Sequence, residues 1–335
     1  MATATKQEAK GSTLIEAIRQ GIHEEMTRDE TVFVIGEDIG EYGGAFKLTE
    51  GFIDEFGAER MIDTPISEAA IVGAACGAAL MGMKPVAEFQ FIDFISCGFD
   101  MLTNYAAKSR YRGCGGIQAV FRGPCGSGVR GGPFHSINAE AFFINTAGLK
   151  IVEPSTAFDA KGLIKAAIRD PDPVLFFEHK KLYRLPRLRE ELPTEDYIVE
   201  IGKARVAREG KDLSIITFGA QVLNALDAAD ELEKSDGLSV EVIDLRTLSP
   251  LDKDAILATV KKTNRVMVLH EASLTGGIGG EISAIIAEEA FEWLDAPVIR
   301  VASIDAPVPF APQMEDYYLP GLTEIIEAAR RLARY

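Results

Sequence analysis

An uncharged stretch of alanine, glycine and aliphatic residues, 69–83, constrains the fold of this chain more than any other feature. Thr64 is a good helix N-cap and Pro65 suits the first helical position, so the sequence predicts a helix that begins here. A helix that is apolar on all sides is typical of a domain interior. One carboxylate, Glu68, lies at its start, and the segment 86–91 predicts a short buried strand after it.

Glu68 has two interpretations. Acidic residues are common in the first turn of a helix because the helix macrodipole favours negative charge there, by less than about 1 kcal/mol. The alternative is a functional carboxylate beside the end of an aromatic strand, near Gln90 and Phe94. Gly73 and Gly77, one helical turn apart, also predict that a neighbouring backbone approaches this helix closely.

Strands and helices alternate along the chain, which indicates an α/β fold with mostly parallel sheets. The first expected strands are 31–36, 86–91, 117–122, 149–154 and 174–178, and the first expected helices are 12–30, 49–56, 99–110 and 157–168. The segment 185–197, rich in Pro, Arg and Glu, predicts a linker. Beyond it, strands at 213–218, 239–245, 266–270 and 297–301 alternate with helices at 221–233, 253–260, 276–293 and 322–334. We therefore expect two α/β domains, residues 1–190 and 201–335, joined by a linker at 191–200.

The net charge of −16, from 51 acidic and 35 basic residues, argues against binding nucleic acid or an anionic membrane through bulk electrostatics. The longest uncharged apolar run, about fifteen residues, is shorter than the roughly 20 needed to cross a bilayer. The N-terminal residues show neither a signal core nor an Arg-rich transit pattern. Four cysteines without paired spacing argue against a disulfide framework or a zinc site. We expect a soluble protein of a reducing compartment, the cytoplasm.

The loop 126–131, Gly-Ser-Gly-Val-Arg-Gly, matches the dinucleotide-binding pattern and follows a predicted strand. That pattern also requires a helix that begins at its third glycine and an acidic residue about twenty positions further on. Here a Pro-Phe-His segment follows instead. We therefore favour a flexible backbone loop that presents His135 over a nicotinamide or flavin site.

Among the four histidines, His135 is the best candidate for proton transfer because it follows a glycine-rich loop at a strand end. His179 and His270 end apolar strands, where sheet sites are often built, although either can equally be structural. His23 lies among acidic residues on an amphipathic helix, which indicates a surface position. No pair of histidines has the spacing of a metal site.

Six segments together resemble one protein family: Ile62-Asp-Thr-Pro-Ile-Ser-Glu68, Glu88-Phe-Gln-Phe91, Arg110-Tyr-Arg112, His135-Ser136, Asp159-Ala-Lys-Gly-Leu163 and Val242-Ile-Asp-Leu-Arg-Thr247. This family is the beta subunit of the decarboxylating component of 2-oxo acid dehydrogenase complexes, of pyruvate or branched-chain type. The resemblance extends over nearly everything after about residue 12. It implies a pyrimidine-binding domain of thiamine enzymes followed by a transketolase C-terminal-like domain. It also implies an α2β2 assembly that shares thiamine diphosphate between subunits and serves a lipoyl-bearing acyltransferase core.

One absence in the sequence agrees with a shared cofactor. Thiamine enzymes usually hold the magnesium diphosphate with a Gly-Asp-Gly…Asn motif, and this chain contains no Gly-Asp-Gly. The chain can offer a site for the aminopyrimidine ring, but it has no evident site for the diphosphate. We therefore expect a separate alpha subunit to hold most of the Mg²⁺ contacts.

The resemblance also implies roles for individual residues. The glutamate that matches Glu68 hydrogen-bonds a nitrogen of the pyrimidine ring and thereby activates the cofactor. Gln90 and Ile66 match positions near this ring, and Phe94 matches the aromatic residue packed on it, where branched-chain members often carry tyrosine. His135 matches a histidine that faces the substrate.

Two further matches are weaker. Glu37 resembles a carboxylate near the cofactor. Asp170 and Asp172 lie in a turn after a helix, where acidic residues are common in any case. They match a turn that binds a potassium ion in some members, although one of the two positions is commonly asparagine in the family.

The main hypothesis is oxidative decarboxylation of a 2-oxo acid with transfer of the acyl group to a lipoyl group. The segment 270–277 resembles branched-chain members, whereas the pair Gln90 and Phe94 also occurs in bacterial pyruvate enzymes, and acetoin-type relatives fit as well. Two other classes stay open. One is a nicotinamide dehydrogenase built on the loop 126–131, and the other is a non-catalytic scaffold subunit in which Glu68 only caps a helix.

Overall fold

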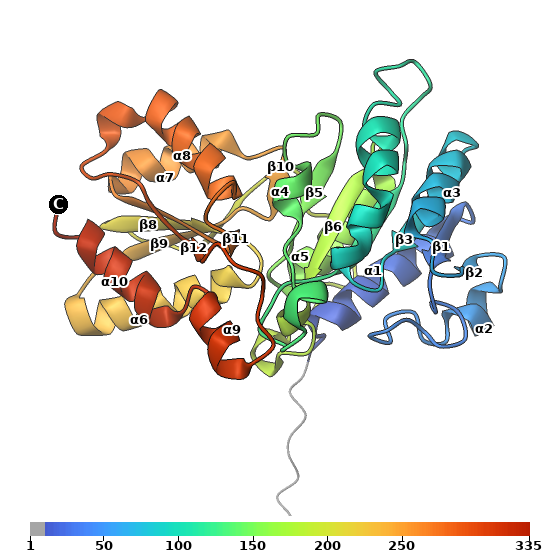
Figure 1. Ribbon diagram of the computed structural model, residues 1–335, viewed down its shortest axis with the longest axis horizontal. Coiled ribbons are helices and arrows are strands. Elements are labelled where there is room, and N and C mark those ends of the chain that lie inside the picture. The colour runs from blue at the N-terminus through green and yellow to red at the C-terminus, as the bar shows by residue number, and fades with distance from the viewer. Residues whose placement is uncertain (1–10) are drawn as a thin grey trace, which may run out of the picture.

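The computed structural model describes residues 11–335, and the N-terminal stretch on which the signal-segment expectation rests lies outside them. Within this range the strands form a seven-stranded and a five-stranded sheet, which lie side by side (Figure 1). Most neighbouring strands in both sheets are parallel, and helices pack on both sides of each. The predicted fold class is confirmed.

The seven-stranded sheet comprises, in spatial order, β10 (Thr247–Ser249), β5 (Lys150–Val152), β6 (Val174–His179), β4 (Val120–Cys125), β3 (Lys84–Glu88), β1 (Val32–Gly36) and β2 (Met61–Asp63). Its helices are α1 (Leu14–Arg28), α2 (Phe52–Phe56), α3 (Glu68–Leu80), α4 (Glu140–Phe143) and α5 (Ala157–Arg169), with a 3₁₀ segment η1 (Ile92–Gly98) and a π-helix η2 (Met101–Ala106). The short strand β10 pairs antiparallel with β5, although it comes from the C-terminal part of the chain. The domain boundaries stay a prediction.

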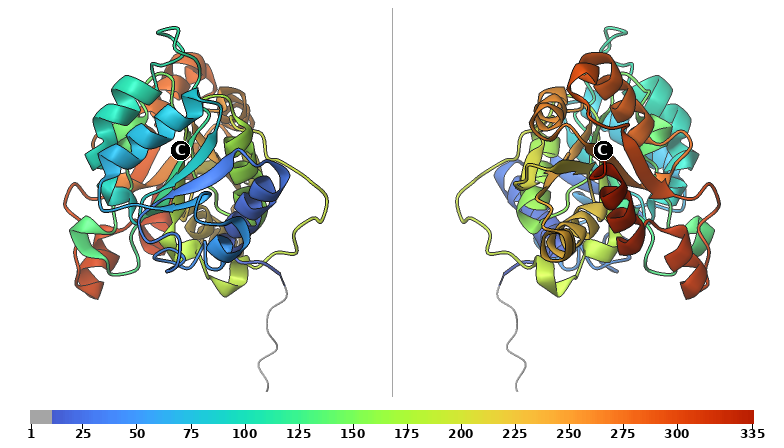
Figure 2. Two further views of the ribbon diagram at one scale, coloured as in Figure 1. Left: turned by 90° about the vertical axis from the view of Figure 1, so that its right-hand side faces the viewer. Right: turned by 90° about the vertical axis from the view of Figure 1, so that its left-hand side faces the viewer.

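The five-stranded sheet has the order β12 (Ile299–Ser303), β11 (Val266–Ser273), β8 (Leu213–Thr217), β9 (Val240–Asp244) and β7 (Arg205–Arg208), of which β7 is an antiparallel edge strand. The helices around it are α6 (Gln221–Asp236), α7 (Lys253–Thr263), α8 (Ile278–Glu289), α9 (Pro312–Tyr318) and α10 (Leu322–Leu332). Figure 2 shows how α6 and α10 lie together on one side of this sheet.

Both faces of the first sheet are apolar, as expected for buried parallel strands. Because side chains alternate along a strand, Val32 and Val34 of β1 enter one core while Phe33 and Ile35 enter the other. The first core lies under α1 and α5, and the second lies under α3 and η1.

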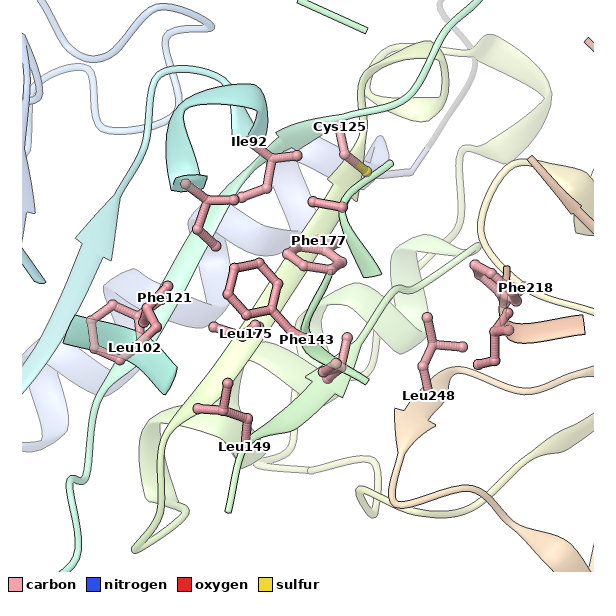
Figure 3. Packing of buried hydrophobic residues seen from close by; sticks show 14 of the residues in the cluster. Ile92, Leu102, Phe121, Cys125, Phe143, Leu149, Leu175, Phe177, Phe218 and Leu248 are labelled. Carbon is pink, nitrogen blue, oxygen red and sulfur yellow. The ribbon is translucent and has the colours of Figure 1, made fainter. Parts of the chain in front are cut away.

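The second of these cores continues into the five-stranded sheet. Figure 3 shows Phe143 and Phe177 in the first sheet's half of this core, and Phe218 and Leu248 in the half toward the second sheet. All four side chains are at most 4% exposed. Since burying one such side chain is worth roughly 1.5–3 kcal/mol, the shared core couples the two sheets strongly.

The helix expected from Thr64 begins at Glu68 instead, with Ser67 as its N-cap. The preceding residues are held in extended conformation because β2 pairs with β1, and the amide of Thr64 donates to the carbonyl of Gly36 (2.9 Å). Sheet pairing therefore overrides the capping signal. As a result, Glu68 is the first helical residue.

The expectation that α3 is buried on all sides is also wrong. Its face toward η1 and η2 is buried, but Ala70, Ala74, Gly77 and Met81 are exposed in this chain. Within residues 11–335, no backbone approaches Gly77, and Gly73 meets only the side chain of Met101.

Among residues 11–335, no helix has both the length and the hydrophobicity to cross a lipid bilayer. Cys76 and Cys125 are buried, Cys97 and Cys114 are exposed, and all four are free thiols, as the sequence predicts.

Candidate functional site

Three neighbouring strands, β1, β3 and β4, end at the same edge of the first sheet. Ligand sites in open α/β sheets form at the carboxyl ends of such strands. Glu37 follows β1, Gln90 follows β3, and the loop that carries His135 follows β4. The topology therefore gathers these three predicted site residues at one edge.

Glu37 and Glu68 form an acidic pair at this edge. Glu37 is only 8% exposed, while Glu68 is half-buried at the first position of α3. Burial raises the pKa of the Glu37 carboxyl, the negative charge of Glu68 raises it further, and a hydrogen bond from the amide of Ser67 acts in the opposite direction. Within residues 11–335, no Lys, Arg or His nitrogen lies within 4.0 Å of either carboxylate. Glu37 therefore holds its proton to a higher pH than an ordinary glutamate does.

Gln90 is fixed by a residue that the sequence did not single out. Its Nε2 donates a hydrogen bond of 2.8 Å to Oδ2 of Asp38, the residue after Glu37. This contact links the end of β3 to the end of β1. It also orients the Gln90 amide, whose carbonyl oxygen has no part in this bond.

His135 lies between two aromatic side chains. Its ring centroid is 4.5 Å from that of Phe91 and 5.7 Å from that of Phe94, and both pairs meet edge to face. Phe94 belongs to η1 and is half-buried, as is His135. The structure thus brings His135 and Phe94 into contact and fixes the imidazole by aromatic packing.

The loop before His135 is held by hydrogen bonds, which contradicts the expectation that it is flexible. Oδ1 of Asp93 accepts from the amides of Ser136 (3.0 Å) and Ile137 (3.1 Å). The hydroxyl of Ser127 donates to the carbonyl of Ser136 (2.9 Å), and the amide of Gly128 donates to Oε1 of Glu315 in α9 (3.0 Å). These contacts fix the backbone on both sides of His135.

A buried carboxylate from the second sheet, Glu271 of β11, completes this support. It accepts hydrogen bonds from the amide of Ser127 (2.7 Å), from Nδ2 of Asn138 (3.1 Å) and from Nε2 of His179 (3.0 Å). Burial alone would raise the pKa of Glu271, but the adjacent His179 and these hydrogen bonds lower it to about 2. His179 is therefore a structural residue that joins the two sheets.

The other two histidines lie away from this edge. Neither ring nitrogen of the buried His270 has a hydrogen-bond partner within residues 11–335, and burial lowers its pKa to about 4, so its ring is neutral. His23 is at the surface, as predicted, where its Nε2 contacts the carboxylate of Glu55 (2.9 Å). Ile66 lies in the segment before Glu68 and is 83% exposed in this chain.

Asp170 and Asp172 already have cationic partners from the protein. Both oxygens of Asp170 accept from Nζ of Lys150 (2.7 and 2.6 Å), and Oδ1 of Asp172 accepts from Nε of Arg110 (2.6 Å). These side chains therefore do not fit a second cation, and the potassium site stays a prediction without support from this geometry. Between residues 11 and 335, no group of three or more His, Cys, Asp or Glu side chains is placed to hold a metal ion.

The loop 126–131 lacks the architecture of a dinucleotide site. A 3₁₀ turn, Gly132–Phe134, follows it, and the next α-helix is the short α4. Gly126 has a φ of +84°, and a Cβ there would lie 2.1 Å from Nε2 of His179. Packing against His179 therefore explains why a glycine stands at position 126. The glycine pattern of this loop is then no longer an argument for nicotinamide binding.

Sequence reasoning missed Asp38, Asp93 and Glu271. A signal existed for the first two, because Asp38 directly follows Glu37 and Asp93 directly precedes Phe94. No pattern pointed to Glu271, which reaches the site from the other sheet. Taken together, the edge offers carboxylates, an amide and an aromatic ring, a set suited to binding a flat nitrogen heterocycle.

Comparison with known proteins agrees with this geometry. Residues 10–186 match the family described as transketolase, pyrimidine binding domain, and residues 202–325 match transketolase, C-terminal domain. The chain is 50% identical to a 2-oxoisovalerate dehydrogenase subunit beta of Bacillus subtilis over 324 residues, covering 96% of this chain and 98% of the relative. It is 47% identical to the pyruvate dehydrogenase E1 component subunit beta of the same organism, covering 96% and 99%.

A more distant relative comes from a plant. The mitochondrial pyruvate dehydrogenase E1 component subunit beta-2 of Oryza sativa is 45% identical, covering 98% of this chain and 88% of the relative. Among solved structures, a split-gene transketolase described as an inactive beta4 tetramer superposes with a TM-score of 0.77, covering 97% of this chain and 99% of that one. At 22% identity, this last likeness shows the fold alone.

Proposed function

The chain belongs to the family of beta subunits of 2-oxo acid dehydrogenase E1 components, and on this premise we propose that it acts in a thiamine diphosphate-dependent 2-oxo acid dehydrogenase. The reaction is the oxidative decarboxylation of a pyruvate-type or branched-chain 2-oxo acid, with transfer of the acyl group to a lipoyl group. The observation that supports this proposal most is the convergence of Glu37, Glu68, Gln90, Phe94 and His135 at one sheet edge.

The residues at this edge fit the aminopyrimidine end of the cofactor. Phe94 offers an aromatic face for packing, and Glu68 offers a carboxyl group that can supply a proton to a ring nitrogen and stay hydrogen-bonded to it. Glu37, whose pKa is raised, can share that proton with Glu68. The bound cofactor supplies the electron sink for the loss of carbon dioxide.

His135 is the proposed acid–base residue toward the substrate. Its loop is fixed by Asp93, Glu271 and Glu315, and its ring by Phe91 and Phe94. A fixed imidazole can donate a proton to the oxygen of the 2-oxo group, a contribution typically worth about 10²–10⁴ in rate. Rigid support of this kind keeps a catalytic group within the narrow tolerance that proton transfer requires.

The partner proposed for this chain is an alpha subunit that completes the cofactor site in an α2β2 tetramer. The supporting observation is that residues 11–335 contain no metal-binding group for the magnesium diphosphate. The acceptor is a lipoyl-bearing acyltransferase. Both proposals extend the names of the relatives, which are subunits of dehydrogenase complexes.

Co-expression with a neighbouring alpha-type reading frame tests this function directly. Decarboxylation of pyruvate and of 2-oxoisovalerate is measured on the purified pair with thiamine diphosphate and Mg²⁺, with acetoin cleavage as a third reaction. We expect turnover of at least one 2-oxo acid by the pair and none by this chain alone. Turnover by this chain alone would contradict a shared cofactor site, and activity on acetoin only would move the assignment to the acetoin-type relatives.

A further inference from the structure

A pocket of about 720 Å³ lies beside His135, between its loop and the segment that follows β6. Phe46, Phe91 and His135 form part of its wall. Its charged lining residues are Lys180, Lys181 and Arg184, and no Asp or Glu lines it. Three cations without an acid are unusual in a chain with a net charge of −16, so this pocket should attract anions.

Lys180 is the most constrained of the three cations. It is 6% exposed, and its Nζ donates one hydrogen bond of 2.7 Å, to the carbonyl of Gly126. An ammonium has three donors, so two have no protein acceptor within residues 11–335. No carboxylate oxygen of this range lies within 4.0 Å of it, and its nearest π contact is the ring of Phe91 at 5.7 Å. Buried charges are normally paired, so a buried ammonium without a counter-ion indicates that a ligand is missing here.

The acidic residues nearest to Lys180 form no ion pair with it. Oδ1 of Asp93 binds the amides after His135, Glu271 binds His179, and Glu315 binds Arg130 (2.6 Å). Oδ2 of Asp93 has no partner within residues 11–335, but it lies more than 4.0 Å from the ammonium. Burial lowers the pKa of Lys180, although the charges of these acids act in the opposite direction. Their attraction therefore does not replace a counter-ion in contact with the ammonium.

The pocket and the proposed cofactor edge share one wall. Phe91 and His135 both line the pocket and contact each other, and His135 also contacts Phe94. A small anion held at Lys180 would therefore lie beside the imidazole, next to the edge proposed for the cofactor.

We propose that this pocket binds the carboxylate of the 2-oxo acid substrate, with Lys180 as its direct partner and Lys181 and Arg184 as longer-range attractors. The inference rests on the proposed function and adds the residue that recognises the acid group. Its chemistry suits the reaction, because the carboxylate departs as neutral carbon dioxide and the pocket then loses its ligand.

This role has a kinetic signature. The charge contact exists in the ground state and weakens as the carboxylate becomes carbon dioxide, so it lowers KM without raising kcat. We expect Lys180→Met to raise KM for the 2-oxo acid at least about tenfold and to leave kcat within about twofold, since one charge-assisted hydrogen bond is lost. Lys180→Arg should recover most of the affinity. A merely structural lysine would instead lower kcat and stability together.

A direct binding measurement tests the pocket independently of turnover. The probes are oxamate, an unreactive anionic analogue of pyruvate, and its neutral counterpart oxamide, with binding measured by isothermal titration calorimetry on the assembled pair without cofactor. Oxamate should bind the wild-type pair and the control Lys211→Met, whose side chain is exposed and distant from the pocket. Binding to Lys180→Met should be at least about tenfold weaker. Oxamide should not bind any variant.

The opposite outcomes overturn the proposal without touching the assigned function. Unchanged oxamate affinity or unchanged KM in an active Lys180→Met pair would do so. Binding to the isolated chain but not to the pair would show that a carboxylate of the partner fills the pocket. If Lys180→Met fails to assemble, the double variant Lys181→Gln/Arg184→Gln, which changes two exposed positions, replaces it. This variant should bind oxamate about threefold more weakly than the wild type. Equal binding would contradict the proposed anion site. An unmodified pair that decarboxylates no 2-oxo acid would instead refute the function.

Discussion

Two pairs of acidic residues in the first sheet have opposite surroundings. Glu88 in β3 and Glu178 in β6 are buried, and both carboxylates bind the guanidinium of Arg122, which is 2% exposed. Glu37 and Glu68 lie one strand further, at the end of β1 and the start of α3, and have no cationic partner within residues 11–335. We therefore expect the first pair to stabilise the fold, and we attribute the free-energy cost of the second pair to the proposed function.

Removing the guanidinium of Arg122, which binds Glu88 and Glu178, should give the largest change in stability. Arg122→Met leaves Glu88 and Glu178 buried beside each other, and also removes the charge that balances the contact from the Tyr183 hydroxyl to Glu178 (2.7 Å). We expect the free energy of unfolding in urea to fall by about 3–5 kcal/mol. The exposed Arg112→Met is the matched control, with an expected change within about 0.5 kcal/mol. A loss below about 1 kcal/mol for Arg122→Met would break the comparison.

Glu68→Gln should give the opposite result. The amide cannot supply the proton that the ring nitrogen must hold, so turnover of the pair with its alpha subunit should fall at least about 10²-fold. Urea unfolding should change by less than about 1 kcal/mol, because Glu68 has no ion pair to lose. Glu59→Gln, at an exposed position, serves as the control. Full activity in Glu68→Gln would favour the scaffold alternative, in which this residue only caps a helix.

Glu271 extends the comparison to the junction of the two sheets. Its folded pKa of about 2 lies below the ordinary value of 4.5, so it stabilises the fold above about pH 4.5 and this contribution is lost as pH falls toward 2. Glu271→Gln should lower the free energy of unfolding by about 2 kcal/mol at pH 7. The difference from the wild type should shrink at pH 3. A pH-independent difference would show that hydrogen bonding alone, and not charge, holds the junction.

Glu140 is the unpaired counterpart of Glu271. It is fully buried, neither carboxylate oxygen has a partner within residues 11–335, and burial followed by the charge of Glu271 raises its pKa to about 7. A raised carboxyl pKa means that its contribution is present below about pH 4.5 and is lost as pH rises through 7. Glu140→Gln should therefore gain about 1–2 kcal/mol over the wild type between pH 5 and pH 8. Parallel pH profiles of the two proteins would contradict this assignment, as would a gain toward low pH.

The alternation of strands and helices was sufficient to predict the fold class, because each long buried strand has a clear apolar run. The missed strands β2, β7 and β10 are short, and β7 is half-exposed with charged residues in it. The start of α3 was misplaced because pairing between β1 and β2 extends to Thr64, a tertiary effect absent from local capping signals. For such elements, sequence pattern alone is insufficient.

The places of Gln90 and His135 were predictable because each follows a strand end, whereas Glu37 was suggested only by the family resemblance. Local sequence did not distinguish Glu68 from Glu88, since only the fold reveals that Arg122 neutralises the latter. Lys180 gave no signal either, because its isolation depends on which acids are already engaged. Pairing of charges across the fold is the information that the linear pattern lacks.

The support of the His135 loop by Glu271 and Glu315 limits how relatives of this chain can be recombined. The two carboxylates lie in the C-terminal part of the chain, while the imidazole that they position belongs to the N-terminal part. A chimera that exchanges everything after the linker would need to import matching acids at both positions. We therefore expect that a first half transplanted alone would leave the His135 loop without these two acceptors.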